Sequence, residues 1–137
     1  MDVFLTDDAE RSFKALSLLS ESGQCGYLIG HRLGPRVYVE AVIPAGKDHP
    51  FRVEQFHLLD VIYEGRTVGF FFWGGGRRAE SRVLKPFAYG KTVLIARPGG
   101  KGAPALRAFT VEYDGRFTLS PVPLSPSPKR KKHERKA

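Results

Sequence analysis

The chain has 137 residues, 42% of them hydrophobic and 26% charged, which is the composition of one soluble globular domain. No apolar run approaches the roughly 20 residues that a membrane-spanning helix needs, so we expect no integral membrane protein. The net charge of +8 is concentrated in residues 125–137, which carry +5 and leave only +3 for the body, a weak case for a nucleic-acid surface on the folded part.

The first half of the chain predicts one helix followed by a β-hairpin. Thr6 can cap a helix over residues 7–21, whose first turn is acidic and therefore suits the positive end of the helix dipole. Apolar side chains recur along it at spacings of three and four, at Ala9, Phe13, Leu16 and Leu19. Two β-rich runs then follow, at 24–30 and 36–44, and the Gly-Pro step between them is typical of a hairpin turn.

The second half predicts a helix and four strands. After a polar loop at 44–50, residues 51–64 read as a helix that Gly65 ends. Its apolar face should hold Phe51, Leu58, Leu59 and Ile62, opposite His57, Asp60 and Glu64. Strands are expected at 66–73 and 91–98, and the Asp-Gly step at 114–115 predicts a second hairpin within residues 106–122.

This order predicts an α+β fold, with a mainly antiparallel or mixed sheet on which the helices pack. Residues 1–124 should form a single globular domain. Residues 125–137 combine proline, serine and like charges without apolar periodicity, and predict a disordered basic tail. The tail offers a candidate polyanion-binding site, composed of Lys129, Arg130, Lys131, Lys132, Arg135 and Lys136.

The compartment is expected to be intracellular, and we predict a cytoplasmic protein. The N-terminus is acidic, where a secretory signal would carry basic residues and then an apolar stretch. The single cysteine, Cys25, cannot form an internal disulfide, which agrees with a reducing compartment. In its apolar context it should behave as a small buried hydrophobe.

Sequence motifs give little support for catalysis. Four histidines are present, none at a metal-ligand spacing, and His57-x-x-Asp60 reads more simply as a solvated helix face. A weak alternative metal set is His31, His49 and Asp48. No G-x-S-x-G elbow is present, and the two glycine-rich segments at 73–78 and 98–104 do not fit a phosphate loop and predict turns. We therefore expect no bound cofactor.

Residues 21–85 resemble the MPN/JAMM family of zinc-dependent isopeptidases. The resemblance lies in the order of parts: a helix, a strand with a Cys-Gly step that ends in Leu-x-Gly, a hairpin, a polar loop, a helix that opens with Phe, and a strand that begins Val-Gly. It implies the family's architecture, which is cytidine-deaminase-like, and a groove beside the zinc that receives the extended tail of a ubiquitin-like protein.

The catalytic residues of that family are missing here. The family places a glutamate before the Cys-Gly step, a His-x-His at the end of the Val-Gly strand, and a Ser-x-x-Asp after it. Alignment on Val68-Gly69 puts Phe72 and Gly74 at the histidine positions, neither of which can bind zinc. Gly23 stands at the glutamate position, with Glu21 two residues too early, and Leu84 stands where the acid should follow Ser81. The resemblance implies a retained fold without hydrolase activity.

The leading hypothesis is a non-catalytic MPN/JAMM-like domain that binds a protein, such as the tail of a ubiquitin-like or another small partner. The candidate groove at the vacated site consists of Phe72, Trp73, Gly74, Arg77, Arg78 and Ser81. At least two of the four aromatic residues at 70–73 should instead fill the core, since an inner strand covered on both faces is continuously apolar. Two alternatives remain open: a nucleic-acid-associated protein that uses the tail, and a metal hydrolase with a non-standard ligand set. The oligomeric state is not predicted.

Overall fold

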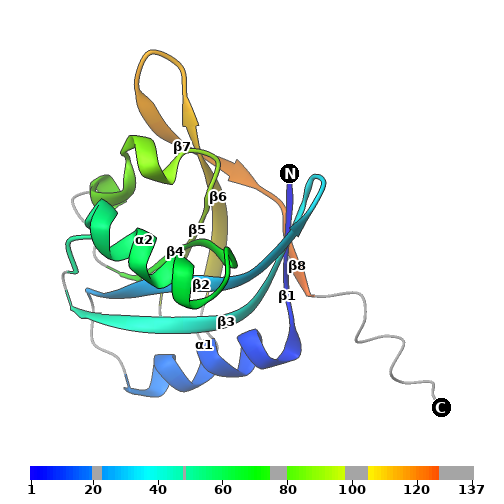
Figure 1. Ribbon diagram of the computed structural model, residues 1–137. Coiled ribbons are helices and arrows are strands. Elements are labelled where there is room, and N and C mark those ends of the chain that lie inside the picture. Colours follow the sequence, from blue (N-terminus) through cyan, green and yellow to red (C-terminus); the bar gives the residue numbers. More distant parts are fainter. Residues whose placement is uncertain (20–22, 48, 75–79, 98–104, 127–137) are drawn as a thin grey trace.

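The computed structural model describes residues 1–19, 23–47, 49–74, 80–97 and 105–126 (Figure 1). Its elements in chain order are β1 (Asp2–Leu5), α1 (Asp7–Leu19), β2 (Gln24–Leu33), β3 (Arg36–Lys47), α2 (Val53–Ile62), β4 (Thr67–Trp73), the 3-10 turns η1 (Ser81–Val83) and η2 (Pro86–Ala88), β5 (Thr92–Arg97), β6 (Ala105–Tyr113), β7 (Phe117–Val122) and β8 (Leu124–Pro126). Thr6 caps α1 as expected, because its Oγ1 accepts a hydrogen bond from Ala9 N at 3.2 Å.

The strands form one mixed sheet in the order β7-β6-β5-β4-β2-β3-β1-β8. The pairs β1–β3, β1–β8 and β4–β5 are parallel, and the other neighbours, including both predicted hairpins, are antiparallel. The expected α+β class is confirmed. Strands β1 and β8 were not predicted, because four and three residues are too few to show a period of two.

The central strand β4 is covered on both faces. Phe70 and Phe72 pack into a core cluster with Phe56 of α2, while Phe71 packs into a second cluster with Phe13 of α1. Figure 1 shows α1 and α2 on opposite sides of the sheet. The four aromatic side chains at 70–73 are each at most 4% exposed, so the expectation that at least two fill the core is confirmed.

The predicted buried face of α2 is wrong for Leu58 and Ile62, which are each 64% exposed. Leu59 packs against the core as predicted, and Phe51 is fully buried but lies before the helix rather than on it. Phe56 is the buried residue of the helix, and it contacts Phe70. The turn after α2 is as expected: Gly65 has a φ of 79° and its amide donates to Asp60 O at 2.8 Å.

Three boundaries differ from the expectation. The polar loop is shorter than predicted, because β3 extends to Lys47. The last two residues of the helix expected over 7–21 lie outside the described residues. Ser125 and Pro126, which the sequence assigned to the tail, belong to β8, and residues 127–137 lie outside the described part. Neither described α-helix is long and apolar enough to cross a bilayer.

The glycines of the Cys-Gly and Val-Gly steps allow close approach of neighbouring strands. A Cβ on Gly26 would lie 2.1 Å from Ile43 O and 2.6 Å from Phe71 Cε2. A Cβ on Gly69 would lie 1.9 Å from Thr92 O. All three distances are far inside van der Waals contact, so the β2–β3 and β4–β5 pairings require glycine at these positions.

Candidate functional site

The residues that the sequence resemblance aligns with a zinc site lie near the carboxyl end of β4. Antiparallel pairing places Cys25 of β2 opposite Phe72, and Gly23 N donates to Trp73 O at 2.8 Å. Phe72 belongs to the same core cluster as Val83 of η1, and Leu84 packs against that cluster. Segments that are far apart in sequence are therefore brought to one place.

The structure corrects the expectation that Phe72 and Trp73 line an open groove. Their side chains are 1% and 4% exposed, so neither offers contact to a partner. Gly74 is half-buried, has a φ of 69°, and donates its amide to Ala96 O at 2.9 Å. Ser81 is exposed at the start of η1, and Arg77 and Arg78 lie outside the described residues.

Beside Phe72 lies a polar pair inside an aromatic cluster. Tyr27 Oη and His49 Nε2 are 2.9 Å apart, and both rings contact Phe51 edge to face. Burial raises the pKa of Tyr27 to about 12, with a smaller contribution from Cys25, and burial together with the charge of Arg82 lowers the pKa of His49. Cys25 is fully buried, as the sequence predicted, and Sγ lies 3.3 Å from Gly46 O.

We expect His49 to titrate below its ordinary pKa of 6.5. Between the lowered pKa and pH 6.5, the unfolded chain then binds more protons than the folded chain. The free energy of unfolding should therefore decrease as the pH falls through this interval, and it should level off below the lowered pKa. An NMR titration of the His49 Cε1 proton measures this pKa; a midpoint of 6.5 or above in the wild type would contradict the assignment.

The alternative metal ligands do not come together. His31 Nδ1 lies 3.2 Å from Glu40 Oε2, and the His31 ring stacks on Tyr38. His49 instead contacts Tyr27, which precedes His31 by four residues on β2. Asp48 lies outside the described residues. No cluster of three or more His, Cys, Asp or Glu that could hold a metal is found within the described ranges.

The His57-x-x-Asp60 pair is also structural. Asp60 Oδ1 accepts a hydrogen bond from Thr67 N at 3.0 Å, so this carboxylate joins α2 to the first residue of β4. The His57 side chain is exposed, and its ring lies against Phe56. The six basic residues of the predicted polyanion-binding tail, Lys129, Arg130, Lys131, Lys132, Arg135 and Lys136, lie outside the described residues.

One surface was missed by the sequence analysis. Leu58, Val61 and Ile62 of α2 are 64%, 75% and 64% exposed, and their spacings of three and four place them on one face of the helix. We call these three residues the α2 apolar face. The sequence indicates that α2 has apolar residues all round. Only the packing shows that Phe56 faces the core and that Leu58, Val61 and Ile62 face away from it.

Comparisons with known proteins give a fold and no function. No family model matches the sequence, and no curated protein matches it. A solution structure of a protein from Desulfitobacterium hafniense matches with a TM-score of 0.63 and 18% identity over the whole of both chains. A solution structure of a protein from Salinibacter ruber matches with a TM-score of 0.59 and 18% identity over 92% of this chain and 93% of that one. Both share this fold. At such low identity the likeness carries no activity over to the present chain.

Proposed function

We propose that this chain is a non-catalytic MPN/JAMM-like domain that binds a partner protein. The alignment with that family puts Gly23, Phe72, Gly74 and Leu84 at the positions of its zinc ligands and catalytic base, and in this chain these four residues lie near the end of β4. None of these side chains can ligate a metal or accept a proton. Phe72 instead completes the apolar core at this point, so the space is used for packing.

The α2 apolar face is the observation that carries the binding role. Three neighbouring large aliphatic side chains on one helix face are an unusual exposure for a soluble domain, and their burial against a partner would be favourable by about 25 cal/mol per Å². The exposed carboxylate of Glu54 lies one turn before Leu58 on α2, and the exposed carboxylate of Glu64 follows the end of the helix. We therefore propose a small protein, ubiquitin-like or otherwise, that presents an apolar patch with a basic rim.

The test begins with a photo-crosslinking amino acid placed at Gln55, an exposed position on α2 beside this face. A crosslinked protein is then purified, and its affinity for the full chain is measured by calorimetry. Leu58→Ser with Ile62→Ser should weaken this binding more than tenfold, because each side chain loses roughly 1.5–3 kcal/mol of burial on complex formation. Leu33→Ser is the matched control: Leu33 is 60% exposed at the end of β2, and its change should leave the affinity unaltered.

Two results would overturn the proposal. One is that the double variant binds the partner as tightly as the wild type does, or that Leu33→Ser weakens this binding as much as the double variant does. The other is stoichiometric zinc in protein purified without a histidine tag, together with cleavage of an isopeptide-linked substrate. Sedimentation velocity separates a further case: if crosslinks join only two copies of this chain and the double variant is monomeric, the α2 apolar face is a self-association surface and not a partner site.

A further inference from the structure

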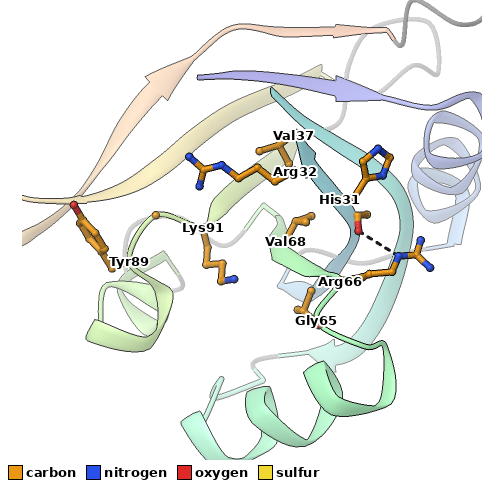
Figure 2. Close-up of a pocket in the computed structure, with 11 residues that line it drawn as sticks. His31, Arg32, Val37, Gly65, Arg66, Val68, Tyr89 and Lys91 are labelled. Atoms are coloured by element: carbon orange, nitrogen blue, oxygen red, sulfur yellow. Dashed lines mark hydrogen bonds between the residues drawn. The ribbon is translucent and has the colours of Figure 1, made fainter. Parts of the chain in front are cut away.

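A basic pocket lies at the opposite end of β4 from the vacated zinc positions. It has a volume of about 590 Å³ and is bounded by the end of β2 and by the segments that precede β4 and β5 (Figure 2). Strands β4 and β5 are parallel neighbours, so their amino ends lie side by side and bring Arg66 and Lys91 to the same cavity. Arg32 enters from β2.

The pocket carries an excess of positive charge. Arg32, Arg66 and Lys91 line it, and none of the described residues that line it carries a carboxylate. Glu40, just outside, pairs with Arg66 Nη2 and lies 3.2 Å from His31 Nδ1. Three positive charges and one neighbouring negative charge give this region a net charge of +2. Arg32 and Lys91 form no salt bridge within the described residues, and the Lys91 ammonium lies 5.6 Å from the centroid of the Phe56 ring. Figure 2 shows Arg32 and Lys91 on the Tyr89 side of the pocket, with Arg66 and His31 on the other.

Side chains, not the backbone, must recognise an anion here. The amides of Gly30, Gly65, Gly90 and Lys91 in the wall already donate to backbone carbonyls, and that of Thr67 donates to Asp60 Oδ1. Arg32 donates from Nε to Gly34 O at 3.1 Å, which orients its guanidinium and leaves the Nη groups without a recorded partner in the described residues. Charge-assisted bonds from Arg and Lys are the strong contacts for phosphate oxygens.

Part of the remaining wall is apolar, and His31 and Thr67 also line it. Val37 and Val68 line the cavity, and Tyr89, 59% exposed, stands at its edge beside Lys91. The volume lies in the range of small-molecule sites and is much larger than one phosphate ion fills. Two uncompensated positive charges match the dianion that a phosphate monoester carries at neutral pH.

We propose that the basic pocket binds a small organic phosphate monoester, with the phosphate between Arg32 and Lys91 and the carbon part against Val68 and Tyr89. The binding of a phosphate is additional to the proposed protein-binding role and does not depend on it. The two are separable by experiment, because the pocket and the α2 apolar face share no residue.

The test is an NMR titration of the full chain with phenyl phosphate at constant ionic strength. Amide signals of Gly30, Gly65 and Gly90 should shift saturably, since these residues line the pocket and report on it rather than on the basic C-terminus. Phenyl phosphate should bind several-fold more tightly than inorganic phosphate, because only the ester has a ring to place against Tyr89. Benzoate, a monoanion with the same ring, should bind more weakly than phenyl phosphate.

Matched variants decide the assignment. Lys91→Gln and Arg32→Gln should each weaken phenyl phosphate about tenfold, the usual effect of losing one charge-assisted contact. Arg97→Gln, at the far end of β5 from Lys91, is the control and should leave the affinity unchanged. Glu40→Gln should tighten binding, because it removes the neighbouring negative charge; a gain of affinity cannot come from unfolding. Absence of saturable shifts at the three glycines, or equal losses in Arg97→Gln, would overturn the proposal.

Discussion

Gly26→Ala should destabilise the protein by about 3 kcal/mol or more, or prevent its folding. The added methyl group would lie 2.1 Å from the carbonyl oxygen of Ile43 and 2.6 Å from the Phe71 ring. The nearest atom belongs to the backbone of a paired strand, and the ring is fully buried, so neither can move aside without disturbing the β2–β3 pairing or the core. Urea unfolding followed by circular dichroism measures the loss.

Gly34→Ala is the matched control for this substitution. Gly34 lies in the β2–β3 turn with a φ of 59°, and an added Cβ would meet no atom within 4 Å. Its cost should be only the roughly 1–2 kcal/mol of a left-handed backbone for a residue with a side chain. If Gly26→Ala lowered the free energy of unfolding no more than Gly34→Ala does, β3 could not approach Gly26 as closely as the structure indicates.

Phe72→Ala should cost about 3–5 kcal/mol of unfolding free energy, the usual range for a fully buried phenylalanine. The ring is 1% exposed and packs against Phe51, whose centroid lies 5.5 Å away, in the cluster that also holds Cys25 and Val83. Truncation leaves a cavity inside this cluster. Chemical denaturation, with the slope of the transition compared between variants, measures the effect.

The result for Phe72 distinguishes a packing role from a groove role. A residue on the wall of an open groove would lose little stability on truncation. Ile62→Ala provides that comparison, because Ile62 is 64% exposed and its loss should change the unfolding free energy by about 0.5 kcal/mol at most. If both variants lost similarly little unfolding free energy, Phe72 would be a surface residue, as the groove predicted from the sequence requires.

Strong local patterns predicted most of the fold. The capped helix α1, both hairpins and the continuously apolar β4 follow from residues within one element, such as Thr6 and the Asp-Gly step at 114–115. The buried face of α2 could not be predicted in this way. Its apolar residues surround the helix, so periodicity does not say which side packs, and contact with Phe70 selects Phe56.

The sites were less predictable than the fold, because they are assembled from separate elements. Arg32, Arg66 and Lys91 each read as an ordinary solvated charge in its own segment, and only the strand order brings them to one cavity. Phe72 illustrates the opposite case. The sequence shows that its side chain has no metal-binding group. Whether the ring faces a groove or the core depends on η1 and on the segment before α2, which pack against it.

The hydrogen bond from Thr67 N to Asp60 Oδ1 connects the two proposed binding surfaces. Asp60 lies on α2 next to Val61, and Thr67 lies in the wall of the basic pocket, with only the turn through Gly65 between them. A partner that displaced α2 on binding would therefore move the pocket wall. Thermodynamic linkage then requires reciprocity: whatever factor the protein partner imposes on the affinity for a phosphate, the phosphate imposes on the affinity for the partner.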